Sequence, residues 1–429
     1  MKYYVIAGEA SGDLHGSNLL KAIQQQQPEA DFRCWGGDLM TEAKGNVVKH
    51  YRDLAFMGFL EVLLNIWTIF KNIRFCKQDI LNYKPDALVL IDYPGFNLRI
   101  AKWAKAQNIK VIYYISPQIW AWDEKRVHQI KKNVDLMLCI LPFEQGFYKK
   151  YDYAVNFVGH PLLDVIKNDK QIDDRQIDDK QIDDKQIDDR AENDSLADNK
   201  QENYKREDDS LEDERRVGNM LSQNVAQNAA QNAAQNVAQK PIIALLPGSR
   251  KQEVLNMLNT MLSIAPQFTD YQFIIAGAPA LDAAFYQETI EKKVGNLGIN
   301  VSFVKNETYN LLRKADAALV TSGTATLEVA LFGIPQIVCY RTSAISYWLA
   351  KRLIRIKYIS LVNLIADKPL VLELIQSDLT TENLATELKQ ILLPANRRNL
   401  EAGYADLRQL LGNEGASQRA ANAIIQFLI

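Results

Sequence analysis

The chain is poor in cysteine and histidine, and none of its 429 residues lies in a long apolar run. The four cysteines lie far apart without CxxC or Cys/His spacing, which argues against disulfides or a zinc site and favours a reducing cytoplasm. No segment reaches the roughly 20 uninterrupted apolar residues that cross a bilayer. The apolar run at 3–7 leads directly into a glycine loop, so we predict neither a spanning helix nor a signal peptide there.

The rest of the composition is that of a globular protein, 47% hydrophobic and 24% charged, and long enough for two domains. One segment departs from it. Residues 168–239 contain tandem QIDDR/QIDDK and NVAQ/NAAQ repeats with 19 acidic and 10 basic side chains, against 33 and 40 in the remainder. Such low complexity predicts a disordered or partly helical linker, with a partner-binding tail as the alternative. The part that folds is therefore predicted to be basic.

Short apolar runs alternate with amphipathic stretches on both sides of this insert, which is typical of parallel sheets with helices on both faces. We predict an α/β protein of two Rossmann-like, doubly wound lobes, 1–167 and 240–429, joined by the 168–239 insert. A final helical run at 397–428 could pack on either lobe. The predicted strands are 3–8, 86–92, 110–116, 136–142 and 156–160, then 241–250, 271–277, 301–304, 317–323 and 335–341.

Two candidate ligand loops follow strands of the first lobe, since ligands of open α/β sheets bind beyond the carboxyl ends of strands. GEASGD at 8–13 permits a tight turn whose backbone N–H groups face a ligand oxygen. The alternative is a plain turn with Ser11 or Asp13 as helix N-cap. IDYPGFN at 91–97 places Asp92 at a strand end, where it is a candidate general base or, alternatively, the cap of the next helix.

Two more loops in the second lobe suit a diphosphate. In LPGSR at 246–250, Gly248 lets the backbone approach and Arg250 supplies a forked cation, although no Walker A lysine follows. TSGTATLE at 321–328 opens a helix with free N–H groups, and Glu328 one turn later could accept hydrogen bonds from ribose hydroxyls. A capping arrangement is the alternative for the second loop.

Other features are less specific. His15 and His160 remain candidates, although lone histidines more often serve structure. The segments 57–75 and 347–360 mix large apolar side chains with basic ones, which fits interfacial helices or, alternatively, core helices with basic flanks. No HExxH, DxD or His/Cys cluster suggests a metal.

Together these motifs resemble one family. The chain is similar to lipid-A-disaccharide synthases over nearly all of its length outside 168–239, and WAW with its basic cluster and SLVNL are the most specific signals. The motifs that carry the resemblance, in order, are GEASGD, MGFLEVL, IDYPGFN, SPQIWAWDEKRV, LPFEQGFY, VGHPLLD, LPGSR, SGTATLE, YWLAKRL and YISLVNLIA.

The resemblance implies a GT-B glycosyltransferase, with a central cleft between its lobes, that joins UDP-2,3-diacylglucosamine to 2,3-diacylglucosamine 1-phosphate. UDP would leave and a β-1,6 linkage would form with inversion. It also implies a cytoplasmic protein held peripherally at the inner-membrane surface, with no cofactor, no metal and no nucleic-acid partner, and it leaves a homo-oligomer open. The catalytic residues implied are Asp92, Arg250 and Asn363. The UDP-binding residues are Gly248, Ser249, Arg250, Ser322, Gly323, Thr324, Ala325 and Glu328, and the acceptor-binding residues are Glu9, Ser11, Gly12 and Asp13.

One departure limits the mechanism. Gly95 stands where the family often has an acid, so a scheme with two carboxylates in that loop is in doubt. The nearest rival is a UDP-N-acetylglucosamine 2-epimerase, which needs no acyl chains and so does not explain the apolar segment at 57–75. A catalytically inactive nucleotide-binding protein at the membrane surface is the other rival, and the joint presence of Asp92, Arg250, Glu328 and Asn363 argues against it.

Overall fold

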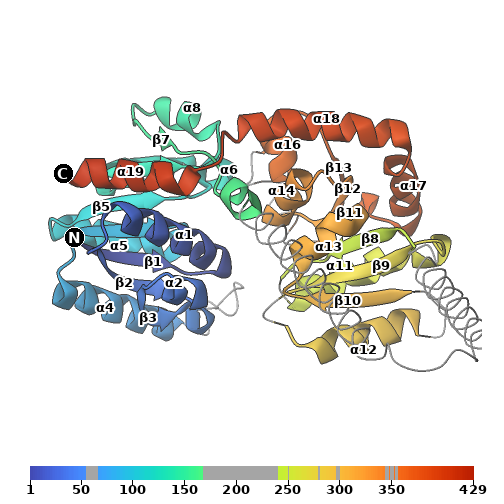
Figure 1. The fold of residues 1–429 in the computed structure, drawn as a ribbon, viewed down its shortest axis with the longest axis horizontal. Helices are drawn as coiled ribbons and strands as arrows, with labels where there is room; N and C mark the ends of the chain where they lie inside the picture. Colours follow the sequence, from blue (N-terminus) through green and yellow to red (C-terminus); the bar gives the residue numbers. More distant parts are fainter. Residues whose placement is uncertain are drawn as a thin grey trace, which may run out of the picture.

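The chain folds around two parallel β-sheets, each flanked by helices (Figure 1). The computed structural model describes residues 1–54, 66–167, 240–249, 251–278, 281–295, 300–343, 347, 352 and 356–429. The predicted insert at 168–239 lies outside the described residues.

The first sheet has seven strands in the order β3-β2-β1-β4-β5-β6-β7, and all its pairings are parallel. Its strands are β1 (Lys2–Ala7), β2 (Asp31–Gly36), β3 (Asn46–His50), β4 (Ala87–Ile91), β5 (Lys110–Tyr114), β6 (Leu136–Cys139) and β7 (Asn156–Phe157). The helices of this part are α1 (Ala10–Gln26), α2 (Asp38–Glu42), α4 (Ile66–Tyr83), α5 (Pro94–Ala106), α6 (Ile119–Trp122), α7 (Val127–Asn133) and α8 (Glu144–Lys149), with 3-10 turns at Tyr51–Leu54 and Glu124–Arg126.

The second sheet has six strands in the order β10-β9-β8-β11-β12-β13, again all parallel. Its strands are β8 (Ile242–Leu246), β9 (Gln272–Gly277), β10 (Val301–Lys305), β11 (Ala315–Thr321), β12 (Gln336–Tyr340) and β13 (Leu372–Ile375). The helices that follow along the chain are α11 (Lys251–Leu262), α12 (Ala283–Val294), α13 (Thr308–Lys314), α14 (Thr324–Leu331), α16 (Leu361–Ala366), α17 (Thr381–Ile391), α18 (Pro394–Leu410) and α19 (Ala416–Leu428), with 3-10 turns at Ala265–Gln267 and Gln376–Asp378.

The central strands are buried on both faces, which explains why they appear in the sequence as continuous apolar runs. In β1, Tyr3 and Val5 belong to one buried cluster with α1 and α19, whereas Tyr4 and Ile6 belong to another on the opposite face. The predicted α/β class with two doubly wound sheets is confirmed, and all ten predicted strands occur near their expected positions. Three further strands, β2, β3 and β13, are not predicted from the sequence.

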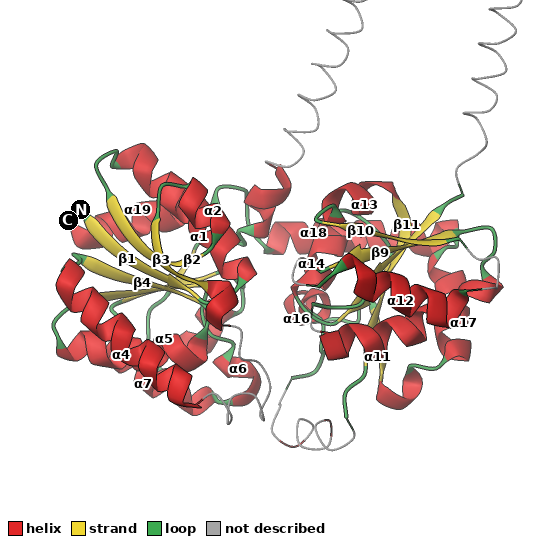
Figure 2. Cartoon of the chain, turned by 90° about the horizontal axis from the view of Figure 1, so that it is seen from below, coloured by secondary structure: helices red, strands yellow, loops and turns green. Residues whose placement is uncertain are grey.

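The final helical run expected at 397–428 is two helices, because Gly412 and Gly415 adopt left-handed backbone conformations between α18 and α19. Helix α18 packs on α14, α16 and α17 of the second sheet, and α19 packs on α1 and β6 of the first. Figures 1 and 2 show this return of the chain to the side of its N-terminus. Across the described ranges, no helix is long and apolar enough to span a membrane.

Candidate functional site

The four predicted ligand loops lie at the points where the two sheets change direction. In the first sheet the chain leaves β1 towards β2 and leaves β4 towards β5, on opposite sides. GEASGD follows β1 and IDYPGFN follows β4, so both open at this switch point. The second sheet repeats the pattern, with LPGS after β8 and SGTATLE after β11. Switch points at the carboxyl ends of strands are the usual ligand sites of such sheets.

Asp92 stands directly after β4 in an unusual backbone conformation. Its φ is 44° and that of Tyr93 is 48°, so two consecutive non-glycine residues are left-handed. Each such residue costs on the order of 1–3 kcal/mol and persists only where the surrounding structure holds it, most often at functional sites. Helix α5 begins at Pro94 with Tyr93 as its N-cap residue. Asp92 therefore does not cap the helix, and that alternative is wrong.

The environment of Asp92 suits a general base. Burial, with the nearby Glu9 carboxylate as a second cause, raises the pKa of Asp92 to about 7, although a backbone hydrogen bond at Tyr93 partly opposes the shift. A base works best when its pKa lies near the working pH, because it is then both available and strong enough to take a proton. Glu9 comes from the first loop, so the two loops of this switch point meet at Asp92.

Gly8 and Tyr93 hold the same two loops together. A side chain on Gly8 would have its Cβ 2.4 Å from the Tyr93 ring, so the ring occupies the space that a larger residue would need. Tyr93 in turn stacks on Phe96, with ring centroids 5.6 Å apart. The glycine of the first loop is thus required by the second.

In the first loop, Asp13 is neither the N-cap of the following helix nor a side chain open to the acceptor. Helix α1 begins at Ala10, so neither Ser11 nor Asp13 is its N-cap. The buried Asp13 carboxylate instead accepts backbone hydrogen bonds at the start of α2, from Gly37 at 2.7 Å and from Leu39 and Met40 at 3.1 Å each. Asp13 therefore fastens α2 to α1 and has no side-chain oxygen turned to a ligand.

The other three acceptor-binding candidates, Glu9, Ser11 and Gly12, differ in their exposure. Gly12 is buried, and a Cβ there would lie 3.1 Å from the Cβ of Ala7, so this glycine allows close helix–strand packing. Ser11 is exposed and Glu9 is partly exposed. Glu9 and Ser11 are thus the two that remain accessible to an acceptor.

The LPGS loop is occupied by a carboxylate of its own chain. Gly248 has a φ of 106°, and a Cβ on it would lie 2.4 Å from Oε2 of Glu253. The same carboxylate accepts the backbone N–H of Ser249 at 3.3 Å. Glu253 thus takes, at the start of α11, a position in which a ligand phosphate would meet N–H donors. Arg250 lies outside the described residues.

The SGTATLE loop leaves its first turn open. Gly323 and Thr324 are exposed, and a Cβ on Gly323 would meet no atom within 4 Å. Glu328 accepts the Tyr309 hydroxyl at 3.0 Å, and burial raises the pKa of the Glu328 carboxyl. Ala325 is half-buried beside them. Tyr309 was not foreseen, because nothing in its local sequence links it to a loop beyond the next strand.

Asn363 is buried and bonded entirely within the protein. Its Nδ2 donates to the Val371 carbonyl at 2.8 Å and to Oε1 of Glu373 at 2.9 Å, while its Oδ1 accepts the Val371 N–H at 2.8 Å. The expected direct catalytic contact is therefore not available in this conformation. The amide instead fixes the SLVNL segment on β13.

Glu373 is the centre of this network, which also reaches the SGTATLE loop. Its carboxylate accepts the backbone N–H groups of Ile359 and Ser360 at 3.0 Å each and the Ser360 hydroxyl at 2.7 Å. Ser322 donates its hydroxyl to the Ile359 carbonyl at 2.8 Å. The only sequence signal for Glu373 was an acid between apolar residues in LELI.

His15 and His160 are both buried. Burial lowers the pKa of His15 to about 4 and that of His160 to about 3, so both are neutral at pH 7. His160 accepts the backbone N–H of Leu162 at 3.3 Å through Nδ1. Within the described parts of the chain, no three His, Cys, Asp or Glu side chains are placed to hold one metal ion.

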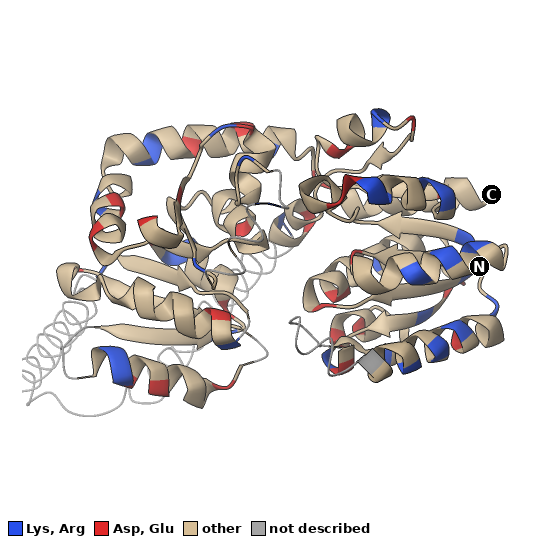
Figure 3. Ribbon diagram, turned by 180° about the vertical axis from the view of Figure 1, so that it is seen from behind, with Lys and Arg blue, Asp and Glu red and all other residues tan. Residues whose placement is uncertain are grey.

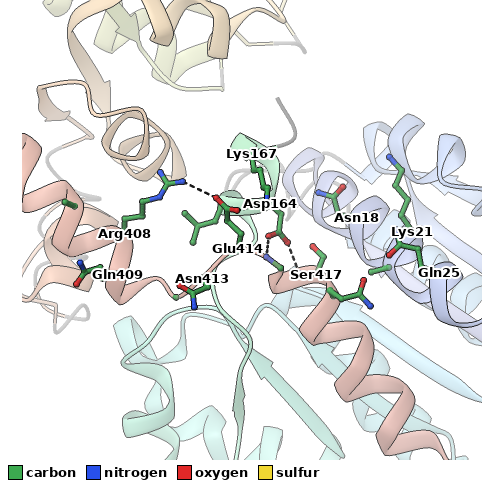
Figure 4. Close-up of a pocket in the computed structure, with 16 residues that line it drawn as sticks. Asn18, Lys21, Gln25, Asp164, Lys167, Arg408, Gln409, Asn413, Glu414 and Ser417 are labelled. Atoms are coloured by element: carbon green, nitrogen blue, oxygen red, sulfur yellow. Dashed lines mark hydrogen bonds and ion pairs between the residues drawn. The ribbon is translucent and has the colours of Figure 1, made fainter. Parts of the chain in front are cut away.

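A pocket of about 950 Å³ lies away from all four loops (Figure 4). It is lined by α1, by residues 163–167 and by the turn between α18 and α19. Asp164 lines this pocket, and its carboxylate accepts the backbone N–H groups of Gly415 at 2.5 Å and Ser417 at 2.9 Å, on the opposite side of it. Glu414 pairs with Lys167 at 2.8 Å. The charges of the pocket are thus largely matched within the protein, and none of the predicted site residues lines it.

Comparison with known proteins gives matches along nearly the whole chain. A family model described as lipid-A-disaccharide synthetase matches residues 3–187 and 208–427. The lipid-A-disaccharide synthase of Syntrophus aciditrophicus is 36% identical over 422 residues, 97% of this chain and 95% of the relative. That of Geobacter metallireducens is 34% identical over 429 residues, covering 99% of this chain and 96% of the relative.

Similar solved structures are more distant in sequence. A UDP-GlcNAc 2-epimerase from Neisseria meningitidis bound to UDP-GlcNAc has a TM-score of 0.58 at 12% identity, over 99% of this chain and 100% of that chain. The glycotransferase of kitacinnamycin has a TM-score of 0.57 at 12% identity, over 100% and 99%. At such identities the likeness shows the two-lobed GT-B-type fold alone.

Proposed function

The chain belongs to the lipid-A-disaccharide synthase family, and from this premise we propose that it transfers a diacylglucosamine unit from UDP-2,3-diacylglucosamine to 2,3-diacylglucosamine 1-phosphate. The products are UDP and a β-1,6-linked disaccharide 1-phosphate. The observation that carries the proposal, beyond the family, is Asp92: a half-buried side chain at a sheet switch point whose carboxyl has a pKa of about 7. A glycosyl transfer to a hydroxyl needs such a base on the acceptor side.

Asp92 takes the proton of the acceptor 6-hydroxyl as that oxygen attacks the anomeric carbon of the donor. Attack opposite to the leaving UDP inverts an α-linked donor into a β-linked product. Glu9 contributes by raising the pKa of the Asp92 carboxyl. Ser11, two residues after Glu9, is exposed and offers its hydroxyl for a hydrogen bond to the acceptor. Gly95 is exposed and brings no second acid, so one carboxylate serves as base.

The second sheet binds UDP through the loops after β8 and β11. Gly323 and Thr324 offer exposed backbone N–H groups at the start of α14 for phosphate oxygens, and Glu328, oriented by Tyr309, accepts the ribose hydroxyls. In the loop after β8, the diphosphate displaces the Glu253 carboxylate from Ser249, and Arg250 adds positive charge for the departing UDP.

The reaction itself is the first test. Purified protein with EDTA is incubated with the donor, with and without the acceptor, and UDP release and product mass are followed. We expect UDP only when the acceptor is present, together with a disaccharide 1-phosphate. Release without acceptor would favour a hydrolase, formation of an epimerised UDP-sugar would favour the epimerase reaction, and activity that EDTA abolishes would contradict a metal-free mechanism.

The nucleotide site has a separate test. Tyr309→Phe removes the hydroxyl that orients Glu328, and Glu328→Gln removes the carboxylate itself. We expect calorimetry to show weaker UDP binding in both variants, with the larger loss, on the order of tenfold, for Glu328→Gln. Tyr271→Phe, at a half-buried position just before β9, is the control. Unchanged UDP affinity in Glu328→Gln would remove the ribose contact from the proposal.

We also propose that α4 holds the protein at the inner-membrane surface, where both lipid substrates reside. Trp67 is 82% exposed and Phe70 57%, and Lys71 and Arg74 are exposed on the same helix. Figure 3 shows Lys and Arg recurring along α4. Exposed aromatic side chains beside basic ones favour the interface of an anionic bilayer. The first part of the apolar segment, 57–65, and half of 347–360 lie outside the described residues.

Vesicle flotation tests this surface. The double variant Trp67→Ser with Phe70→Ser should lose most binding to vesicles that contain anionic phosphatidylglycerol. Leu410→Ser, which removes an apolar side chain of 45% exposure on α18, should bind like the unchanged protein. Equal flotation of all three proteins would place membrane binding elsewhere.

A further inference from the structure

The backbone carbonyl of Asp92 is held by two side chains that the proposed chemistry does not use. The hydroxyl of Tyr113 donates to it at 2.6 Å, and Nδ2 of Asn97 donates to it at 2.8 Å. The same Asn97 amide reaches the carbonyl of Ile91 at 3.2 Å. Tyr113 comes from β5 and Asn97 from α5, so two neighbouring elements converge on one carbonyl at the end of β4.

These contacts fall where the backbone is least favourable. Asp92 and Tyr93 are both left-handed, a conformation that side-chain-bearing residues avoid unless other interactions hold it. The Asp92 N–H donates to the Tyr114 carbonyl at 3.2 Å, and the N–H of Asn97 donates to the Tyr93 carbonyl at 3.0 Å. The turn is therefore fixed on both sides, and its carbonyl is fixed by Tyr113 and Asn97.

Neither side chain is accessible to a substrate. Asn97 and Tyr113 are both 0% exposed, so they act on a ligand only through Asp92. Burial raises the pKa of Tyr113 well above its ordinary value, so its hydroxyl remains a donor at any pH at which the enzyme works. The Tyr113 hydroxyl therefore keeps its hydrogen bond to the Asp92 carbonyl while the Asp92 carboxyl gains or loses its proton.

We propose that Tyr113 and Asn97 are positioning residues that hold the strained Asp92–Tyr93 turn and so aim the Asp92 carboxylate at the acceptor hydroxyl. This rests on the proposed function only in naming Asp92 as the base. Without the two hydrogen bonds the turn relaxes, and the carboxylate moves away from Glu9 and into water. Its misplacement lowers turnover, since shifts of about 1 Å in a catalytic group cost up to about a hundredfold.

Tyr113→Phe is the variant that removes one hydrogen bond and little else. We expect kcat to fall at least about tenfold while the Kd for UDP changes less than twofold, and the acid limb of the kcat–pH profile to move below pH 7. Tyr153→Phe is the matched control, because the Tyr153 hydroxyl also donates to a backbone carbonyl, that of Val134 at 3.1 Å, in the same part of the core. The control should keep the kcat and pH profile of the unchanged enzyme.

A double variant separates positioning from loss of structure. In an Asp92→Asn background, Tyr113→Phe should have almost no further effect on the residual turnover, because the group it positions is gone. An equal fold-loss in both backgrounds would overturn the proposal, as would a kcat and an acid limb that Tyr113→Phe leaves unchanged.

A third measurement needs no turnover. Carboxyl carbon NMR titration, with Asp92 assigned by the signal missing in Asp92→Asn, should show a lower Asp92 pKa in Tyr113→Phe than in the unchanged protein. An unchanged pKa would count against the positioning role. Failure of the synthase assay with a lowered Asp92 pKa would instead sink the proposed reaction and leave the positioning role standing.

Discussion

Replacing Asp92 by asparagine should make the protein more stable at alkaline pH while it destroys activity. The pKa of Asp92 is about 7 in the native state against 3.8 for an ordinary aspartate, chiefly because burial disfavours its charge. Because the native pKa is raised, the stabilising effect of the proton is complete below about pH 3.8 and is lost as the pH rises through 7. Above pH 7 the native protein must hold a partly buried charge that asparagine lacks.

The size of the effect follows from the two pKa values. A difference of that size is worth at most about 4 kcal/mol, and the partial solvent access of the carboxyl reduces our expectation to about 2 kcal/mol. Asparagine also tolerates the left-handed backbone well, but that contribution does not depend on pH. The diagnostic quantity is therefore how the stability difference between the two proteins changes with pH.

Urea unfolding at pH 5 and pH 8 measures it. The advantage of Asp92→Asn over the unchanged protein should be larger at pH 8 than at pH 5 by about 1–2 kcal/mol. Asp86→Asn is a control, because Asp86 precedes the same strand and accepts the N–H of Lys2 at an exposed position. A difference that is the same at both pH values would mean that Asp92 carries no raised pKa.

Three further predictions concern the framework. His15 and His160 have lowered pKa values, so their contribution to stability should be full above pH 6.5 and fall towards pH 4; variants with asparagine at either position should lose less stability between pH 7 and pH 5, by up to about 2 kcal/mol in urea unfolding. Asp164→Ala removes three hydrogen bonds at the start of α19 and should cost about 1–2 kcal/mol in the same assay; an unchanged midpoint would show that these hydrogen bonds do not stabilise the fold. Gly8→Ala should push the Tyr93 ring away and reduce kcat more than UDP binding; unchanged kinetics would show that the contact is dispensable.

The strands of both sheets could be predicted where burial makes both faces apolar. The strand β4, with Ala87 to Ile91 all buried, is such a run. The strand β2 was missed because Arg33 interrupts its apolar pattern. The partner that makes Arg33 tolerable is Asp79, whose Oδ1 lies 2.7 Å from the arginine Nη2 and which belongs to a distant helix. Such a pairing depends on tertiary contact that no local pattern shows.

In the candidate site, too, local sequence signals predict some residues, whereas others depend on tertiary contacts. Asp92 and the glycine loops could be predicted because strand ends and glycines are local signals. The left-handed turn at Asp92 could not, because the donors that hold it, Asn97 and Tyr113, converge only when β4, α5 and β5 pack together. Asn363 was expected at the chemistry, but its amide is fully bonded inside the protein, since the motif gave its position and not its partners.

The most direct test of Asp92 as the base compares turnover and nucleotide binding in one preparation of Asp92→Asn. We expect acceptor-dependent UDP release to fall by about a hundredfold or more while the Kd for UDP stays within twofold of the unchanged enzyme. Turnover retained within tenfold, or loss of turnover and UDP binding together, would contradict the assignment of Asp92 as the group that takes the acceptor proton.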